Sequence, residues 1–283
     1  LLEQGALPNL QALIDRGQRE VLRSTVPTHS WSAWPSFLTG VEPQDHGVYD
    51  ILETVPGTHK QYPVTYKSIK ARTFLDDLTA AGKNQLLLDV PLTFPAPTPF
   101  TGSLLAGGVL PKNRPFTAPE DLTETLAKAG LEWPINCMSW TTYHNKPDPY
   151  LDEAYEVTAK RIKVSEFLMD ETDWDLMASV WVSIDRTQHC LSNYVAPDHP
   201  DYAKNKDTRI GKKVADIFRQ TDDAIGRFVS RARPDDLILF ISDHGFQSCT
   251  RTVNMDRLLK EFGYLEFSAS NVVFGPMQWG PVR

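Results

Sequence analysis

The sequence predicts an α/β fold with a mainly parallel central sheet and helices on both of its faces. Short apolar runs alternate with longer amphipathic segments along most of the chain, which is the βαβ pattern of a parallel sheet. Two of these runs end directly in Asp and His residues, and open α/β sheets bind ligands at the carboxyl ends of their strands. With 283 residues and 41% hydrophobic content, the chain is long enough for one large domain or two smaller ones.

Each expected element has a sequence signal of its own. A helix that opens at Pro8 and closes at Gly17 has proline at its first position and glycine after its last turn. The run Leu237–Ile241 has the length and apolar character of a buried strand. In chain order, the expected elements are helix Pro8–Ile14, strand Glu20–Val26, a helix from Ser30, helix Thr73–Ala81, strand Gln85–Val90, helix Pro119–Ala129, helix Tyr150–Met169, strand Met177–Ile184, helix Ile210–Ala232, strand Leu237–Ile241 and helix Met255–Phe262.

Two stretches interrupt this alternation. Phe94–Pro119 is rich in proline and also holds several glycines, which predicts an irregular loop or the base of a lid. Trp133–Tyr150 is aperiodic and rich in aromatic and polar side chains. Together with the helix after it, this second stretch could form a cap over the site, or it could be an ordinary surface excursion. We therefore expect a small irregular cap insertion within residues 94–150.

Composition limits the range of partners and compartments. A formal net charge of −7 leaves no basic stripe for a nucleic-acid duplex, and no run approaches the roughly 20 apolar residues of a membrane span. Three cysteines without a CxxC pair are expected to be free thiols, which favours a cytoplasmic setting. The chain shows no signal segment, but it starts without methionine and a signal could precede it, so the compartment stays open. The oligomeric state is not readable either.

Two Asp/His pairs are the strongest chemical signal in the sequence. Asp243 and His244 follow the apolar run Leu237–Ile241 after Ser242, and Asp185 and His189, four residues apart, follow the apolar run Leu176–Ile184. That spacing places both side chains on one face if a helical turn starts at Asp185. Each pair offers a carboxylate and an imidazole to one cation, so the sequence predicts a two-metal centre.

The ligand types indicate which metal to expect. Imidazole together with carboxylate suits zinc, with manganese as an alternative, whereas calcium and magnesium prefer oxygen ligands alone. Other readings of each motif remain open at this point. An Asp-His dipeptide is common in solvated turns, and an Asp/His pair four residues apart is a common contact on a helix surface.

A candidate nucleophile lies near the N-terminus. Ser30 follows the expected first strand and stands at the start of a helix, where free backbone N–H groups attract phosphoryl oxygens. Serine is also a favoured N-cap residue, and Thr28, Ser32 and Ser36 are rival hydroxyls. The neighbouring His29 is expected to point away from Ser30, since adjacent side chains of an extended segment lie on opposite faces.

The order of these segments resembles the alkaline phosphatase superfamily, specifically its type I phosphodiesterase/nucleotide pyrophosphatase branch. The resemblance rests on a Leu-Pro-Asn-Leu-x-x-Leu helix at Leu7–Leu13, a Pro-Thr-x-Ser segment running to Thr-Gly at Pro27–Gly40, a Pro-x-x-His-Gly turn at Pro43–Gly47, and the two Asp/His blocks. Eukaryote-type members carry asparagine just after the His-Gly turn, where this chain has Ile51, so it is similar to the prokaryotic-type members.

By position, the resemblance implies a role for each candidate residue. Ser30 aligns with the nucleophile, which also contacts metal. Asp185 and His189 align with ligands of one metal, and Asp243 and His244 with ligands of the other. Two further ligands of the family, an aspartate before the first helix and a histidine near the C-terminus, have no counterpart here. We therefore expect the catalytic domain to be trimmed at both termini.

The implied activity is metal-dependent hydrolysis of a small phosphoester or nucleotide, of the phosphodiesterase or nucleotide pyrophosphatase type. It would proceed through a phosphoseryl intermediate at a two-metal site. A phosphomonoesterase or a phosphomutase-like phosphotransferase is the alternative among enzymes. A metal-poor relative that binds a phosphorylated ligand without turnover is the alternative of another class.

Overall fold

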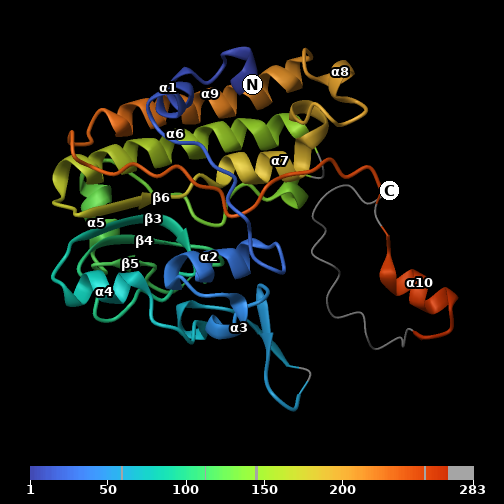
Figure 1. The fold of residues 1–283 in the computed structure, drawn as a ribbon, viewed down its shortest axis with the longest axis horizontal. Coiled ribbons are helices and arrows are strands. Elements are labelled where there is room, and N and C mark those ends of the chain that lie inside the picture. The colour runs from blue at the N-terminus through green and yellow to red at the C-terminus, as the bar shows by residue number, and fades with distance from the viewer. Residues whose placement is uncertain (59, 112, 144–145, 252, 267–283) are drawn as a thin grey trace. The chain divides into compact units, whose positions relative to one another are not determined.

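The computed structural model describes residues 1–58, 60–111, 113–143, 146–251 and 253–266 (Figure 1). The α-helices are α1 Pro8–Arg16, α2 Ser30–Thr39, α3 Pro43–His46, α4 Phe74–Ala80, α5 Leu122–Lys128, α6 Pro147–Glu171, α7 Val182–Val195, α8 Tyr202–Asn205, α9 Arg209–Val229 and α10 Met255–Glu261. The 3-10 helices are η1 Leu2–Gln4, η2 Tyr66–Ser68 and η3 Trp140–Tyr143. The strands are β1 Leu52–Thr54, β2 Gln61–Pro63, β3 Gln85–Pro91, β4 Gly102–Gly107, β5 Thr117–Ala118 and β6 Leu176–Ser179.

A four-stranded sheet with the order β5-β4-β3-β6 carries the main hydrophobic core. β3 pairs in parallel with both β4 and β6, and β5 adds to β4 as an antiparallel edge strand. A separate antiparallel hairpin, β1-β2, follows α3. The mixed α/β fold with a mostly parallel sheet is thus confirmed for the part of the chain that the structure describes.

Alternate residues of β3 pack against helices on opposite faces of the sheet. Leu86 and Leu88 belong to a core cluster with residues of α5 and α6, whereas Leu87 and Val90 pack with residues of α2 and α4. Every residue of β3 except Pro91 is buried. This explains why the strand reads as a continuous apolar run, because a strand covered on both faces needs no polar side. Figure 1 shows α6 on one side of the sheet and α2 and α4 on the other.

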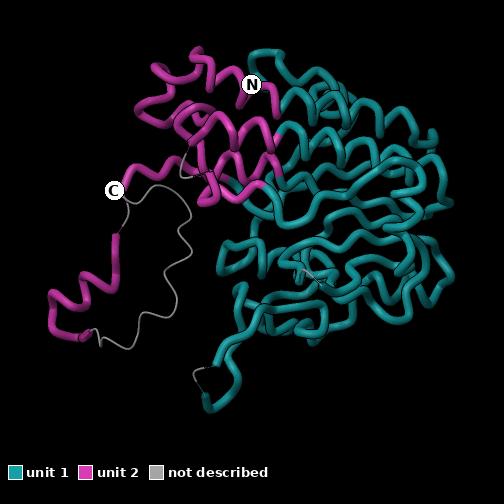
Figure 2. Tube along the Cα trace, turned by 180° about the vertical axis from the view of Figure 1, so that it is seen from behind, with its two compact units in different colours: residues 1–137, 155–182, 218–245 teal, residues 138–154, 183–217, 246–283 magenta. Residues whose placement is uncertain are grey.

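The chain divides into two compact units (Figure 2). Unit 1 comprises residues 1–137, 155–182 and 218–245, and therefore contains the whole sheet. Unit 2 comprises residues 138–154, 183–217 and 246–283. Ser30, Asp243 and His244 belong to unit 1, whereas Asp185 and His189 belong to unit 2.

α6 and α9 are linked by ion pairs at a constant sequence offset. The four pairs, each 61 residues apart, are Asp148 with Arg209 and Asp152 with Lys213 in unit 2, and Glu166 with Arg227 and Asp170 with Arg231 in unit 1. Along the two helices, the residue numbers of both partners increase together and always differ by 61. The helices therefore run parallel to each other. This is the arrangement expected for helices that cover the same face of a parallel sheet.

A buried carboxylate holds α1 in unit 1. Asp222 on α9 is 2% exposed and accepts hydrogen bonds from the backbone N–H groups of Asn9 and Leu10, at 2.9 and 2.8 Å, and from the Asn9 side chain at 2.9 Å. The first backbone N–H groups of a helix have no partner within the helix, so an anion there is stabilising. Asp222 thus explains the position of the helix that the Leu-Pro-Asn-Leu motif begins.

Three of the expected strands are wrong in whole or in part. Neither Glu20–Val26 nor Leu237–Ile241 is a strand, because neither forms a ladder with another described segment, and Leu237 is 82% exposed. The expected strand Met177–Ile184 ends early, at Ser179 in β6. The last residue pair between β6 and its partner β3 is Ser179 with Leu88. Asp89, the next residue of β3, has a positive φ of 61°, so the β3 backbone turns there and no longer offers regular hydrogen bonds to β6.

The stretch Phe94–Pro119, expected to be irregular, contains β4 and β5. The glycines that suggested a loop are required by the sheet instead. A Cβ atom on Gly102 would lie 2.1 Å from the Gln85 carbonyl oxygen, and one on Gly107 would lie 2.1 Å from that of Asp89. Glycine therefore allows β4 to approach β3 closely at both of its ends.

The expected helices are all present, with boundaries moved by a few residues. α4 begins at a capping box in which Thr73 and Asp76 bond each other's backbone N–H groups. α6 is longer than expected at both ends. Among the described residues, no helix is long and apolar enough to cross a membrane.

Candidate active site

Ser30 is the first residue of α2, as the sequence predicted. His29 is the N-cap, and its Nδ1 atom accepts the backbone N–H of Trp31 at 3.3 Å. His29 therefore satisfies the helix start rather than activating the neighbouring hydroxyl. Trp31 packs on Gly108 in the loop after β4, where a Cβ atom would lie 3.2 Å from the indole ring. This contact positions the first turn of α2 against the carboxyl end of the sheet.

The rival hydroxyls are all engaged in bonds that shape the segment. Thr28 donates to a backbone carbonyl at 3.1 Å, and Ser32 donates to two backbone carbonyls at 2.8 and 2.9 Å. Ser36 lies 3.0 Å from Nε2 of His46. Ser30 differs from them because its hydroxyl meets a side chain from a distant part of unit 1.

That side chain is His244. Its Nε2 atom lies 3.1 Å from Oγ of Ser30, and its Nδ1 atom lies 3.0 Å from the backbone carbonyl of Gly245. A carbonyl oxygen only accepts, so this bond places the proton of a neutral ring on Nδ1. The lone pair of Nε2 then faces the Ser30 hydroxyl. Asp243 completes the group, with Oδ2 at 3.7 Å from the same Nε2 atom.

A second bond joins the two chain segments that carry this group. Ser24 donates its hydroxyl to the backbone carbonyl of Asp243 at 2.6 Å. The segment before α2 and the segment that ends in Asp243 and His244 therefore lie side by side in unit 1, although neither is a strand. The structure brings three of the candidate residues together: Ser30, Asp243 and His244.

The other Asp/His pair lies on α7 in unit 2. Asp185 and His189 are one helical turn apart, with Nε2 of His189 at 3.3 Å from Oδ1 of Asp185. The ring of Phe246 packs edge-on against the His189 ring at a centroid distance of 4.8 Å. α7 begins at Val182 rather than at Asp185, and the four-residue spacing does place both side chains on one helix face.

His46 is a structural residue, as expected for the His-Gly turn. It is fully buried, its Nδ1 atom accepts the Val48 backbone N–H at 3.1 Å, and its Nε2 atom therefore donates to Ser36 on α2. Burial lowers the pKa of His46 below its ordinary value of 6.5. A neutral ring thus ties the His-Gly turn to the helix that carries Ser30.

Trp140 and Tyr143 both contact one buried tyrosine ring. Both pack edge-on against Tyr150 within unit 2, at centroid distances of 5.1 and 6.4 Å. Burial raises the pKa of Tyr150, and it also raises the pKa of the Cys190 thiol to about 11. At neutral pH Cys190 is therefore a protonated thiol and a poor nucleophile. Cys137, Cys190 and Cys249 are all free, as the sequence predicted.

The donor sets of both pairs fit a divalent cation. Each offers one carboxylate and one imidazole nitrogen, the combination that zinc accepts readily. In unit 1 the Nε2 lone pair of His244 already faces an oxygen atom, and the Asp243 carboxylate is close to it. The chemistry of the side chains therefore supports cation binding at each pair.

Comparison with known proteins identifies relatives of the chain. The model of the family "Type I phosphodiesterase / nucleotide pyrophosphatase" matches residues 1–278. No curated protein is similar enough in sequence to count as a match. Among solved structures, the chain is similar to phosphonoacetate hydrolase from Sinorhizobium meliloti 1021 in complex with phosphonoacetate, with a TM-score of 0.50 and 16% sequence identity. The similarity covers 81% of this chain and 49% of that chain, so this chain spans about half the length of that enzyme. At this identity the similarity supports the alkaline-phosphatase-like fold alone.

Proposed function

Because this chain belongs to the type I phosphodiesterase/nucleotide pyrophosphatase family of the alkaline phosphatase superfamily, a family of phosphoester hydrolases, we propose that it hydrolyses phosphoesters with Ser30 as the nucleophile. The observation that carries this proposal is the 3.1 Å contact between Oγ of Ser30 and Nε2 of His244. It joins the expected nucleophile to an expected metal ligand from the other end of unit 1.

The proposed reaction begins with in-line attack of the Ser30 oxygen on phosphorus. A bond forms between Oγ and phosphorus while the bond from phosphorus to the leaving oxygen breaks, which gives a phosphoseryl intermediate that water then hydrolyses. The Ser30 hydroxyl proton would pass to solvent water as its oxygen attacks, and the leaving oxygen would take a proton from water. The position of Ser30 at the first turn of α2 supports phosphoryl binding, because the N–H groups of a helix start favour an anion.

We assign two divalent metal ions to the chain, with zinc preferred and manganese as the alternative. Asp243 and His244, with Ser30, would hold one ion, and Asp185 and His189 would hold the other. When bound, such ions supply positive charge that favours the serine alkoxide and stabilises the leaving oxygen. No side-chain general base is then required. The Nε2 lone pair of His244, which faces the Ser30 hydroxyl here, would bind the metal ion in place of that hydrogen bond.

We propose small phosphodiesters or nucleotide pyrophosphates as substrates. A phosphomonoesterase or phosphomutase-like phosphotransferase would need further Arg or Lys side chains around a dianionic phosphate. We further propose that 1–283 acts as a single catalytic domain. The parts of residues 94–150 outside β4, β5 and α5 would serve as its cap. A relative that binds a phosphorylated ligand without turnover is the remaining alternative, and it predicts binding without product.

Hydrolysis of bis-(p-nitrophenyl) phosphate and of p-nitrophenyl phosphate, each with added zinc or manganese, tests the proposal. The diester is expected to react faster than the monoester. Ser30→Ala is expected to lower kcat by about 10³-fold or more, as for other enzymes that lose their nucleophile. Thr28→Val is the matched control, because that hydroxyl only bonds a backbone carbonyl, and it should retain activity within a few-fold. Equal activity of Ser30→Ala and the wild type would refute the mechanism. Ligand binding without turnover in the metal-loaded wild type would favour the non-catalytic alternative.

A further inference from the structure

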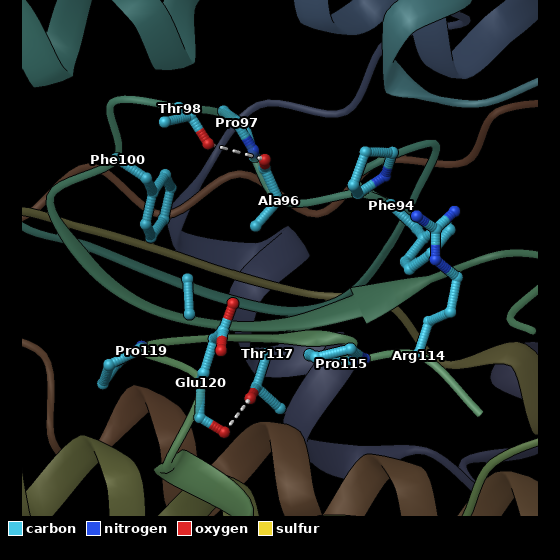
Figure 3. Close-up of a pocket in the computed structure, with 12 residues that line it drawn as sticks. Phe94, Ala96, Pro97, Thr98, Phe100, Arg114, Pro115, Thr117, Pro119 and Glu120 are labelled. Carbon is cyan, nitrogen blue, oxygen red and sulfur yellow. Dashed lines mark hydrogen bonds between the residues drawn. The ribbon is translucent and has the colours of Figure 1, made fainter. Parts of the chain in front are cut away.

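A cavity of about 410 Å³ opens beside the β5 edge of the sheet in unit 1 (Figure 3). One wall is the loop Phe94–Phe100 that leads from β3 into β4, and the other is the segment Arg114–Glu120 that includes β5. The volume is within the usual range of small-molecule sites. Neither the proposed nucleophile nor any of the proposed metal ligands lines this cavity, although its walls belong to the proposed cap region.

Most of the side chains along both walls are apolar, and several of them are conformationally stiff. Phe94 is 7% exposed and belongs to the core cluster between the sheet and α2 and α4, against which Ala96 and Phe100 also pack. Four of the lining residues are prolines, whose fixed φ angles limit the motion of both walls: Pro95, Pro97, Pro115 and Pro119. A cavity with walls of this kind loses little conformational entropy when a ligand binds.

The charged side chains of the cavity are Arg114 and Glu120. Arg114 is exposed and forms no ion pair or hydrogen bond with another residue of the described chain. In Figure 3 its guanidinium extends from the β5 side toward Phe94 on the opposite wall. Among the described residues, the arginine thus presents an unpaired cation beside aromatic and proline side chains, which favours a ligand that carries both an anionic and an apolar group.

We infer that this cavity binds a small planar organic carboxylate. The planar guanidinium matches the two oxygens of a carboxylate, and the aromatic and proline walls suit a flat apolar body. Glu120 lines the same cavity and would repel a second negative charge, so a monoanion fits better than a dianionic phosphate. The inference does not depend on phosphoester hydrolysis, and its test needs no turnover.

Titration calorimetry with 2-naphthoate, and with 2-naphthol as a neutral analogue that has the same ring system, tests this site. We expect 2-naphthoate to bind at least about tenfold more tightly than 2-naphthol, because 2-naphthol cannot form the charge-assisted hydrogen bond between a carboxylate and the Arg114 guanidinium. Arg114→Gln should weaken 2-naphthoate binding by a similar factor and leave 2-naphthol binding unchanged. Phe100→Ala should weaken both ligands.

Lys128→Gln is the matched control, because Lys128 is an exposed cation on α5, the next helix after β5, and does not line the cavity. The two substitutions remove the same charge from the same unit, and the control should change binding by less than about twofold, as expected for a screened surface charge. Thermal unfolding of each variant confirms that the fold is retained. Equal weakening by Lys128→Gln and Arg114→Gln, equal binding of naphthoate and naphthol, or no binding of naphthoate to the wild type would each overturn the inference.

Discussion

Nε2 of His244 lies 3.1 Å from Oγ of Ser30, although the two residues are 214 positions apart in the sequence. The contact brings the start of α2 together with the Ser-Asp-His-Gly block inside one compact unit. A hydroxyl and an imidazole lone pair that face each other are the groups that one cation would ligate together. The same arrangement makes the roles of both residues testable by metal content as well as by activity.

Metal analysis should distinguish the ligand histidines from a surface histidine. After zinc loading and dialysis, we expect about two equivalents of zinc in the wild type and the loss of about one in His244→Ala and in His189→Ala. His199→Ala is the control, because its Nδ1 atom only accepts the Asp201 backbone N–H. Mass-spectrometric zinc quantification measures this. Unchanged zinc in both ligand variants would contradict the assignment.

Stability should depend on pH through His46. Burial lowers the pKa of His46 in the folded protein, whereas the unfolded chain protonates at the ordinary value of 6.5. Between the two pKa values the unfolded state binds more protons than the folded state. The contribution of the neutral His46 ring to the free energy of unfolding is therefore complete above pH 6.5 and is lost as the pH falls below 6.5. Urea unfolding between pH 5 and 8 should therefore show stability falling toward acid, with a slope of at most about 1.4 kcal/mol per pH unit from one proton. His46→Gln should be less stable and should show a smaller slope in this range. An unchanged slope in that variant would exclude His46 as the source.

Removing the Asp222 carboxylate should loosen α1. Asp222→Ala leaves two backbone N–H groups and the Asn9 side chain without their buried acceptor, and it should lower the free energy of unfolding by about 3 kcal/mol. Asp223→Ala is the matched control on the same helix, since Asp223 is exposed, and it should change stability by less than about 0.5 kcal/mol. Chemical denaturation compares the two. Similar losses for both variants would mean that the Asp222 contacts add no measurable stability.

The parallel register of α6 and α9 predicts a small, salt-dependent stabilisation. Arg231→Gln removes the pair with Asp170 and should cost about 0.5–1 kcal/mol, because both partners are partly exposed. Lys212→Gln removes an exposed cation on α9 that has no partner among the described residues, and it should cost less. Denaturation at low salt and in 1 M NaCl measures the effect, and the difference between the variants should shrink in high salt. A difference that persists at high salt would indicate lost packing rather than lost charge pairing.

The sequence predicted the spacing of the candidate ligands on their helix better than the strands that lead to them. The spacing of Asp185 and His189 was enough to place them on one helix face, because a helical turn is local. Leu237–Ile241 has the composition of a buried strand, but a strand also needs a partner, and composition says nothing about which segment supplies the ladder bonds. Gly102 and Gly107 were misread as loop residues for the same reason, since their close approach to β3 is a non-local contact.

The sequence by itself determined the α/β class, the order of the helices and the strand expected at Gln85–Val90, which is the parallel strand β3, because periodicity and capping are properties of neighbouring residues. Only the tertiary structure decided that Ser30, rather than Thr28, Ser32 or Ser36, has a hydroxyl facing His244. It also decided that Asp222 anchors the helix containing Asn9, and that Arg114, which has no ion pair with another described residue, lines a cavity beside β5. These facts depend on where distant segments of the chain meet, and no local pattern of residues encodes that.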